Sequence, residues 1–452
     1  MVALGGDRQV SGFDLAVIGG GVSGLAAATA LAEAGRRVIV LEARGDLGGR
    51  ATAFRDRVTG ELVDNGQHVL FGCYRETFSF FRRIGAEDNV SVQPSLEVPY
   101  LDSAGTRSVL LCPPWPPPLH LLGGVLRWKA IPWRERLGVL RVRADLDTRL
   151  RQSDSGETVA GWLTRRRQRG RIREWLWEPL AVAALNQAAS EAAAAPFLRV
   201  LQLMFNGRRA DASLALPLRP LHETYARPAQ RFIEKHGGSV RVNALGRVRI
   251  DNGRVAGVDV RGEPVPVQKV IAAVPWFALA SLVTGDVAPI ADVLAAASRM
   301  ESKPIVTVNL WYDRVVMDDP FVGLPGRRMQ WVFDKRRVFG ESASHLSLVA
   351  SGADALVVEE ADRLIAMAAA EVAASIPGAR DAVLRRGTVV REKRATFSVA
   401  PGQPPRPGVK TPVDGLFLAG DWIDTGLPGT IESAAIAGHW AAAAALQDTE
   451  RA

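Results

Sequence analysis

Apolar runs alternate with glycine-rich and polar breaks, which predicts a strand–helix–strand unit at the start of the chain. Residues 15–18, directly after Asp14, form a short apolar run that leads into three consecutive glycines. An Ala- and Leu-rich segment over 22–34 follows with a helical composition, and Gly35 is placed to end it. A second apolar run over 37–42 ends at Glu42. Such a unit is typical of an α/β domain.

The second half of the chain shows strand-like and helical patterns in turn. Apolar and polar residues alternate over 238–260, and Asp251–Asn252–Gly253 reads as a hairpin turn. Further strands are predicted over 269–276, 304–313, 329–334, 345–350 and 416–420, and helices over 354–376 and from Thr430 onward. The strand over 269–276 is expected to return to the first domain.

Composition places the chain among ordinary globular proteins. It has 452 residues, of which 47% are hydrophobic and 23% charged, so disorder and fibrous repeats are excluded. The length corresponds to about two or three domains. The 56 Lys and Arg exceed the 48 Asp and Glu, for a net charge of +8. That excess fits either a codon bias toward Arg or an anionic partner.

The cysteine content and the apolar runs indicate in which cellular compartment the protein is expected. Cys73 and Cys112 are too few for a disulfide framework or a structural zinc site, so no metal is expected. The uncharged run from Leu15 to Ala32 contains four glycines, and a strand, turn and helix explain it better than a membrane span. No signal-peptide pattern precedes it. We expect a cytoplasmic protein that does not cross a membrane.

The glycines of the first turn match the pattern G-x-G-x-x-G. Gly19 permits the tight turn, Gly21 leaves room for a pyrophosphate, and Gly24 lets the helix approach the strand. The helix N-terminus offers free N–H groups and a positive dipole end to phosphates. Glu42, at the end of the next strand, is placed to accept ribose hydroxyls. Together these features predict a dinucleotide site.

Two further segments favour FAD over NAD. Gly48 and Gly49 place bare backbone near the pyrophosphate, and Arg50 supplies a planar cation for its charge. Near the C-terminus a strand ends at Gly420, and Asp421 is placed to meet a ribityl hydroxyl.

The E-x-x-x-x-x-G-G-R arrangement from Glu42 to Arg50 and the terminal G-D … T-I-E-S-A helix resemble the flavin-containing amine oxidase and phytoene desaturase superfamily. The resemblance implies FAD, with the N-terminus of the last helix pointing at the flavin. The residues expected to bind it are Gly19, Gly21, Val22, Ser23, Gly24, Glu42, Ala43, Arg44, Gly48, Gly49, Arg50, Gly66, Gln67, His68, Val248, Gly420, Asp421, Thr430 and Ile431.

The implied fold class is α/β, with a Rossmann-type FAD-binding domain and an interleaved α+β substrate-binding domain. The FAD-binding domain is expected over residues 12–75, 235–285 and 385–452. The substrate-binding domain is expected over 76–234 and 286–384.

Three long segments, over 64–88, 177–190 and 420–442, resemble the squalene-associated branch of the superfamily, the bacterial hydroxysqualene dehydroxylases. The resemblance implies reductive removal of an allylic hydroxyl from a hydrophobic isoprenoid, giving squalene for hopanoid synthesis. Amine oxidases of the superfamily carry an aromatic residue just before the terminal Glu. Thr430 and Ile431 stand there in this chain, so an aromatic cage for an amine is not expected.

Removal of a hydroxyl needs a hydride source, here the reduced flavin, and an acid for the departing oxygen. His68 is the titratable group nearest the expected flavin site, although a lone histidine is more often structural, and Asp424 is a second candidate. Glu432 is expected to cap the helix start or to be buried there. The chain carries one dinucleotide motif, so the electron donor that reduces the flavin is not identified.

A segment over 107–150 carries the pattern of a membrane contact. Trp115, Trp128 and Trp133, with Arg and Lys nearby, resemble an interfacial anchor on an anionic membrane. The protein would then be peripheral, on the inner face of the plasma membrane. The alternative is a substrate-domain helix with a solvated basic face. No nucleic-acid fingerprint is present, so nucleic acid is not expected as a partner.

Two other activities and one inactive form compete with the dehydroxylase interpretation. A carotenoid or phytoene-type desaturase would use the same apolar cavity and flavin in the oxidative direction. An amine oxidase is disfavoured by the missing aromatic residue. A non-catalytic lipid-binding flavoprotein would hold flavin that never changes redox state with substrate.

Overall fold

A computed structural model describes residues 12–142, 156–205, 207–341 and 344–448. Its first sheet has five parallel strands in the order β10-β2-β1-β14-β21. The strands are β1 Leu15–Ile18, β2 Val38–Leu41, β10 Ser239–Arg241, β14 Val270–Ala272 and β21 Leu416–Leu418. All residues of β1, β2, β14 and β21 are buried, as in parallel sheets covered on both faces. The predicted Rossmann-type α/β fold is confirmed.

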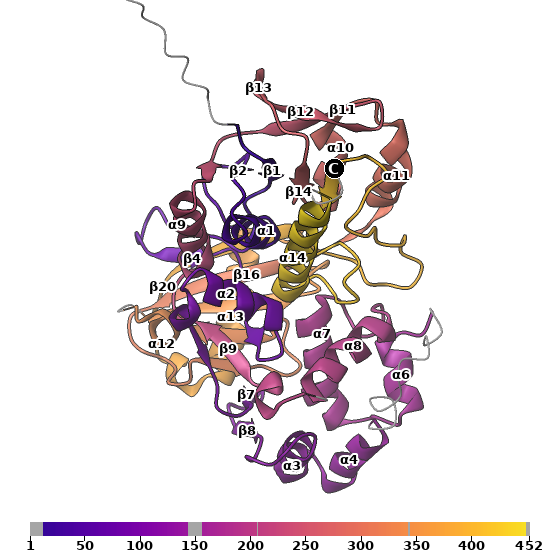
Figure 1. The fold of residues 1–452 in the computed structure, drawn as a ribbon. Helices are drawn as coiled ribbons and strands as arrows, with labels where there is room; N and C mark the ends of the chain where they lie inside the picture. The colour runs from indigo at the N-terminus through magenta and orange to yellow at the C-terminus, as the bar shows by residue number, and fades with distance from the viewer. Residues whose placement is uncertain (1–11, 143–155, 206, 342–343, 449–452) are drawn as a thin grey trace, which may run out of the picture.

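Helices from the two ends of the chain lie side by side on this sheet (Figure 1). They are α1 (Val22–Glu33) and α14 (Ile431–Gln447). Their contact runs through Gly438, where an added Cβ would lie 2.3 Å from the Ser23 carbonyl oxygen and 3.1 Å from Ala26 Cβ. A bare backbone at Gly438 is therefore required for the two helices to pack this closely.

A second, mostly antiparallel sheet has the strand order β20-β16-β19-β18-β17-β7-β8. Its strands are β7 Glu97–Leu101, β8 Arg107–Leu111, β16 Ser302–Tyr312, β17 Phe321–Gly323, β18 Trp331–Asp334, β19 Ser344–Ser351 and β20 Leu384–Phe397. α13 (Ala361–Ser375) packs on β16 and β20. The strands expected over 304–313, 329–334 and 345–350 are all present.

β20 differs from the expected domain boundaries, which place residues 385–397 in the FAD-binding domain. The strand pairs with β16 from Ser302 to Tyr312 and so belongs to the second sheet. β20 pairs with β16, which is far away in the sequence. The sequence of residues 384–397 alone does not indicate which strand they pair with.

Smaller sheets and helices complete the two domains. One sheet contains β11 (Gly246–Asp251), β12 (Arg254–Val260), β13 (Glu263–Val265) and β15 (Val283–Gly285). The expected hairpin turn is present, with positive φ at Asn252 and Gly253. The other elements are β3 Ala53–Arg55, β4 Leu62–Asp64, β5 Leu70–Phe71, β6 Val90–Val92, β9 Leu214–Pro217, α2 Arg75–Arg83, α9 Arg227–Lys235, α10 Leu279–Leu282, α11 Ala291–Arg299 and α12 Lys335–Phe339.

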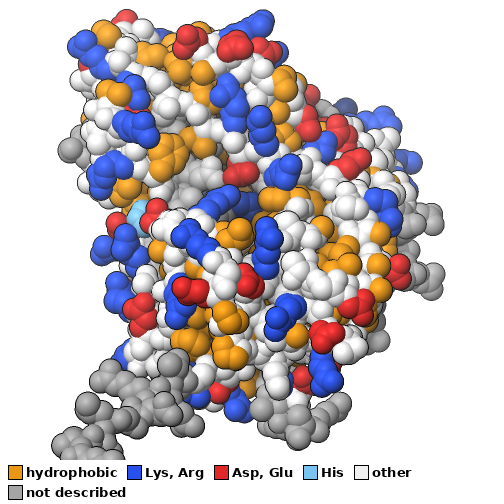
Figure 2. Space-filling view, turned by 90° about the horizontal axis from the view of Figure 1, so that it is seen from above, with side chains coloured by type: hydrophobic (Ala, Val, Ile, Leu, Met, Phe, Trp, Pro, Cys, Tyr) orange, Lys and Arg blue, Asp and Glu red, His pale blue; other side chains and the backbone are white. Residues whose placement is uncertain are grey.

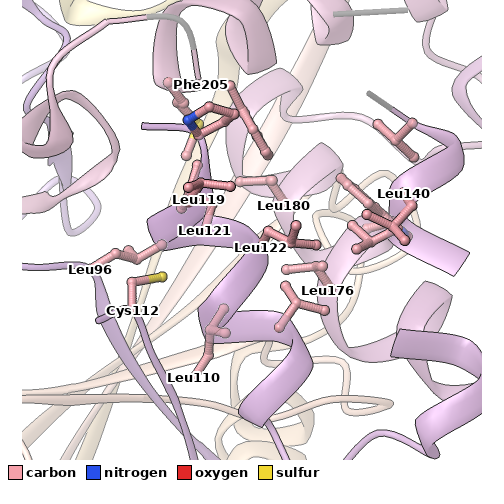
Figure 3. Close-up of a pocket in the computed structure, with 16 residues that line it drawn as sticks. Leu96, Leu110, Cys112, Leu119, Leu121, Leu122, Leu140, Leu176, Leu180 and Phe205 are labelled. Carbon is pink, nitrogen blue, oxygen red and sulfur yellow. The ribbon is translucent and has the colours of Figure 1, made fainter. Parts of the chain in front are cut away.

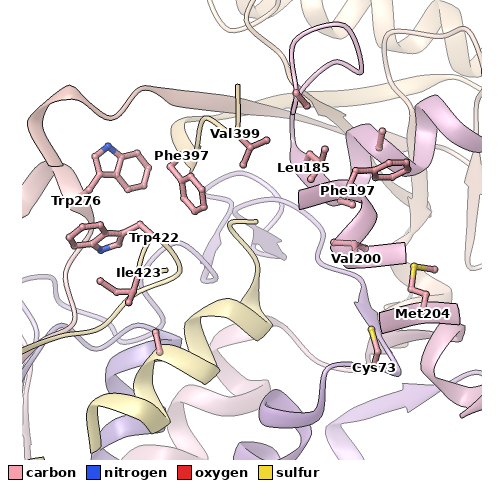
Figure 4. Close-up of a cluster of buried hydrophobic side chains, with 14 of the residues drawn as sticks. Cys73, Leu185, Phe197, Val200, Met204, Trp276, Phe397, Val399, Trp422 and Ile423 are labelled. Atoms are coloured by element: carbon pink, nitrogen blue, oxygen red, sulfur yellow. The ribbon is translucent and has the colours of Figure 1, made fainter. Parts of the chain in front are cut away.

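A helical lobe lies at the lower right in Figure 1 and contains α3 (Leu119–Arg127), α4 (Trp133–Gly138), α6 (Val159–Arg165), α7 (Glu178–Leu185) and α8 (Ala194–Phe205). Figure 4 shows part of the buried cluster that continues from this lobe to the cofactor domain. Leu185, Phe197 and Met204 lie on one side of it, and Trp276 and Trp422 on the other. Among the described residues, no helix has the length and apolar character needed to cross a membrane.

The interfacial role expected for Trp128 is wrong. Its side chain is 2% exposed, and its indole Nε1 donates to Ser108 Oγ at 2.8 Å. α3 ends just before this residue, and the turn directs the ring inward against Tyr100 and Trp175. Residues 143–150 of the expected membrane segment lie outside the described residues.

The helix contact at Gly438 gives a stability prediction. Gly438→Ala should lower the free energy of unfolding by about 1–3 kcal/mol, because the added methyl group overlaps the backbone of α1. Thermal denaturation followed by circular dichroism measures the change. Gly408→Ala is the matched control, since nothing lies within 4 Å of its added Cβ. An unchanged Tm for Gly438→Ala would contradict the packing described.

Candidate functional site

A cavity of about 490 Å³ opens between the two large sheets, within the range of about 300–1,000 Å³ common for ligand sites. Figure 2 shows the hollowed face from above, with Lys and Arg side chains around the hollow. Seventeen of the nineteen predicted FAD-binding residues line the cavity: Gly19, Gly21, Val22, Ser23, Glu42, Ala43, Arg44, Gly48, Gly49, Arg50, Gly66, Gln67, His68, Gly420, Asp421, Thr430 and Ile431.

The first glycine turn brings α1 into contact with the end of β1. An added Cβ at Gly24 would lie 1.9 Å from the Gly19 carbonyl oxygen, so α1 can start here only with a bare backbone. Gly24 itself packs inside the protein, away from the cavity wall. At Gly21, by contrast, an added Cβ would meet only Gly49 Cα at 3.9 Å, so this backbone faces open cavity. The backbone at Gly24 and at Gly21 therefore fits the close helix contact and the open space for a pyrophosphate that the motif predicts.

Glu42 ties the two glycine loops together. Its Oε2 accepts from Gly20 N at 2.7 Å, and its Oε1 accepts from Arg44 N at 2.8 Å. Gly48 N donates in turn to the Gly20 carbonyl at 2.8 Å. Tyr225 lies just before α9, and its hydroxyl donates to the Gly48 carbonyl oxygen at 2.8 Å. This hydrogen bond supports the loop that carries Gly48 and Gly49. Each carboxylate oxygen keeps a lone pair for a ribose hydroxyl.

The residues at the N-terminus of α1 fit a phosphate group. Ser23 Oγ is buried and has no hydrogen-bond partner among the described residues, although Ser23 lines the cavity. No side chain caps α1, so its first N–H groups remain available. A phosphate placed there would satisfy both the hydroxyl and the helix end. This orphaned hydroxyl and the bare glycine backbone suit a dinucleotide.

The C-terminal segment meets the first domain through an ion pair. Arg50 pairs with Asp421, and its other amino group donates to the Ala395 carbonyl at 2.7 Å. Asp421 is 6% exposed and follows Gly420, whose φ is +148°. Thr430 caps α14 by accepting from Ser433 N at 3.1 Å. The positive end of α14 therefore points into the cavity, as expected.

The loop between β4 and β5 forms the polar part of the wall. His68 Nδ1 lies 3.0 Å from the Gly66 carbonyl and donates to it, which leaves Nε2 without a partner among the described residues. Burial lowers the pKa of His68 below its ordinary 6.5, while the charge of Asp64 acts in the opposite direction. Asn65 Nδ2 donates to Glu392 Oε2 at 3.0 Å, and Glu392 also lines the cavity.

Two residues of the cavity wall, and one that supports it from behind, were not found from the sequence. Glu392 comes from β20, whose pairing has no local signal. Tyr74, directly before α2, lines the cavity, and burial raises its pKa far above the usual value. Tyr225 reaches the Gly48 loop from a segment more than 170 residues away. The D-N-G-Q-H motif could have pointed to Asn65 beside His68.

Three residues that were expected to take part in the site lie elsewhere or make other contacts than expected. Val248 is fully buried in β11, and its neighbours over 244–246 line the cavity instead. Asp424 is not brought to the cavity: its carboxylate is 59% exposed and pairs with Arg406 at 3.0 Å. Glu432 is buried as expected, but it caps α2 rather than its own helix, accepting from Thr77 N at 2.9 Å and Glu76 N at 3.0 Å.

A second pocket lies in the helical lobe, between α3, the short turn over 139–142 that follows α4, α7 and α8 (Figure 3). Its lining is almost entirely apolar and includes Leu96, Leu110, Cys112, Leu119, Leu121, Leu122, Leu140, Leu176, Leu180 and Phe205. α7 links it to the first cavity, because Leu180 lines the pocket while Ala183 and Ala184 line the cavity. Charged groups are absent from the lining of this pocket among the described residues.

Comparison with known proteins identifies the family. The model of the flavin containing amine oxidoreductase family matches residues 22–446. A hydroxysqualene dehydroxylase from Rhodopseudomonas palustris is 31% identical over 94% of this chain and 96% of its own. Another from Sinorhizobium fredii is 28% identical over 96% of this chain and 98% of its own. A 15-cis-phytoene desaturase from Synechococcus elongatus is 24% identical over 96% and 95%.

Solved structures share the fold. An oxidoreductase from Methanosarcina mazei superimposes with a TM-score of 0.72 and 16% identity, covering 94% of this chain and 98% of its own. The chain belongs to the flavin containing amine oxidoreductase family. The prediction of an FAD-dependent oxidoreductase is thereby confirmed.

The open space at Gly21 gives a prediction for FAD binding. Gly21→Val should fold, because the backbone here is extended and no protein atom lies close to the new Cβ. It should lose FAD, since the side chain occupies the phosphate position. The FAD-to-protein ratio, from absorbance of the purified protein, measures the loss.

Gly45→Ala is the matched control for Gly21→Val. It lies on the neighbouring loop, and its added Cβ makes only an ordinary contact with Asn243 at 3.5 Å. This variant should keep FAD. Stoichiometric FAD in Gly21→Val would show that the phosphates bind elsewhere.

Proposed function

We propose that this member of the flavin containing amine oxidoreductase family removes the hydroxyl group of hydroxysqualene reductively and forms squalene, the precursor for hopanoid synthesis. The observation that carries the proposal is the near full-length similarity to hydroxysqualene dehydroxylases, at 28% and 31% identity. The reaction consumes two electrons and two protons and releases water. When bound, reduced FAD supplies the hydride that replaces the hydroxyl.

The protein's own residues must bind an apolar chain and exclude water from it. The cavity wall next to α14 carries Ile431, Ala434 and Gly429, and α7 adds Ala183 and Ala184. These side chains are small and offer no nucleophile to an allylic cation. A dry wall of this kind protects such a cation from capture by water. The adjoining apolar pocket extends the same surface for a long isoprenoid chain.

We further propose that His68 donates the proton to the departing oxygen. Its Nδ1 is held by the Gly66 carbonyl, so Nε2 is the atom that carries the transferable proton into the cavity. Only the protonated ring can give that proton. Because burial lowers the pKa of His68 below its ordinary 6.5, the acid form predominates only below that lowered pKa, and turnover should slow as the pH rises through the lowered pKa. Asp424 is not assigned a role, because it lies at the surface.

We propose that the helical lobe docks on an anionic membrane, where an isoprenoid substrate is dissolved. Trp115 and Trp133 are 41% and 62% exposed, and Leu119 and Leu140 are exposed beside them. Both of these leucines also line the apolar pocket, so the pocket opens at this face. Arg127 lies over the Trp115 ring at 4.5 Å, which places a cation at headgroup level.

Single-turnover kinetics test the reaction. Protein reduced with dithionite under anaerobic conditions should convert hydroxysqualene to squalene, with the flavin absorbance returning in step with product. His68→Gln should keep FAD but slow this turnover by about 10²–10⁴-fold, because the amide cannot protonate the leaving group. Product extraction and flavin absorbance together measure the rate.

The control for His68→Gln is His236→Gln, whose ring lies on the surface against Phe232. It should react like the natural protein. Reduced protein that leaves hydroxysqualene untouched, while oxidised protein desaturates phytoene, would replace the dehydroxylase proposal with the desaturase alternative. That alternative draws support from the 24% identity to a phytoene desaturase.

Vesicle co-sedimentation tests the membrane proposal. Binding should rise with the fraction of anionic lipid and fall with added salt, because screening weakens the Arg and Lys contacts. Replacing both Trp115 and Trp133 by Ser should weaken binding several-fold. Trp440→Ser is the matched control, since Trp440 is 49% exposed on α14, away from the helical lobe. Absence of binding by the natural protein at low salt would rule the docking out.

A further inference from the structure

A buried ion pair lies directly behind the wall that carries His68. Lys335 begins α12 and Asp64 ends β4, and their side chains are 1% and 2% exposed. Lys335 Nζ lies 3.0 Å from Asp64 Oδ2 and 3.3 Å from Gln67 Oε1. The same Nζ lies 3.6 Å from the centroid of the Phe339 ring. The pair therefore joins a helix of the substrate domain to the loop that lines the cavity.

The cost of burying these charges argues against a purely structural role. Each buried ion loses several kcal/mol of hydration, and well-packed apolar residues serve stability as well or better. Asp64 Oδ1 is also buried with no hydrogen-bond partner among the described residues. One carboxylate oxygen therefore keeps negative charge that Lys335 does not neutralise locally.

The charged groups around His68 come from several elements. Asp64 lies on the same loop and favours the protonated ring, whereas Arg50, from the second glycine loop, disfavours it. Glu392 of β20 reaches the loop through Asn65. Lys335 of α12 faces Asp64 and opposes its effect through the ion pair.

We propose that Asp64 and Lys335 are positioning residues for His68. Asp64 supplies the counter-charge for His68 protonated on Nε2, and Lys335 fixes both Asp64 and Gln67 so that the loop holds the ring at the cavity wall. The consequence for turnover rests on the proposed function. The effect on His68 itself is a property of the FAD-bound protein without substrate.

Histidine NMR measures that property directly. The chain has six histidines, so the signal missing from His68→Gln assigns His68 in the ¹⁵N-labelled, FAD-bound protein. Asp64→Asn should lower the pKa of His68 by about one pH unit, the low end of the change that a neighbouring opposite charge produces. Lys335→Met should raise it, because the charge of Asp64 is then no longer opposed.

Two further variants keep the test decisive. The double variant Asp64→Asn with Lys335→Met leaves no unpaired buried charge, and it should fold with the pKa of His68 below that of the natural protein. Lys303→Met is the control, since Lys303 pairs with Glu191 and Asp354 outside the cavity wall, and it should leave His68 unchanged. An unchanged pKa of His68 in Asp64→Asn or in the double variant would overturn the proposal. A Lys335→Met protein in which it does not rise would overturn the part assigned to Lys335.

The pH dependence of single turnover separates this proposal from the proposed function. Turnover should fall as the pH rises through the pKa of His68, so the fall should move to lower pH in Asp64→Asn and to higher pH in Lys335→Met. A natural protein that does not convert hydroxysqualene overturns the function, while the NMR result still decides the positioning pair. NMR changes without matching changes in turnover overturn His68 as the acid and leave the pair in place.

Discussion

The close approach of α1 to its neighbours is the constraint on which the rest of the site depends. A Cβ at Gly24 would lie 1.9 Å from the Gly19 carbonyl, and one at Gly438 would lie 2.3 Å from the Ser23 carbonyl. At these two glycines, α1 approaches the turn after β1 and the terminal helix α14 backbone to backbone. Because protein interiors are close-packed, neither contact can loosen without moving the helix. The N-terminal end of α1, where we expect the phosphates to bind, is therefore positioned by elements from both ends of the chain.

The terminal helix, α14, also positions part of the cavity wall, through the hydrogen bonds of Glu432 in its first turn. The buried carboxylate of Glu432 accepts from the backbone of Glu76 and Thr77, which satisfies donors at the start of α2. α2 in turn places Tyr74 beside Thr430 in the wall. Burial raises the pKa of Glu432 and the hydrogen bonds from Thr77 lower it, so the hydrogen bonds offset part of the cost of burying a carboxylate. α14 thus positions the N-terminus of α1 and the part of the cavity wall that carries Tyr74 and Thr430.

The sequence was sufficient where a feature depends on a few consecutive residues. The glycine turn, the strand that ends at Glu42, and the start of α14 at Thr430 each follow from local backbone requirements. It was not sufficient where burial depends on a distant partner. Trp128 and Trp133 look equivalent in sequence, yet Trp128 is enclosed by Tyr100 and Trp175. β20 and Glu392 are placed by pairing with β16, and Lys335 meets Asp64 across 271 positions. Such contacts depend on how the two domains interleave.

The way in which the two domains interleave also places polar residues on one part of the cavity wall and apolar residues on another. The loop over 65–68 and Glu392 place hydrogen-bonding groups on one part of the wall, backed by the Asp64–Lys335 pair. α7 carries small apolar side chains on the opposite stretch and continues toward the leucine-lined pocket. A long apolar molecule with a single hydroxyl has the same asymmetry. Its hydroxyl would lose hydrogen bonds anywhere except beside the polar loop, while its chain gains most from burial along α7. The wall itself therefore favours one orientation of such a substrate, with the oxygen next to His68.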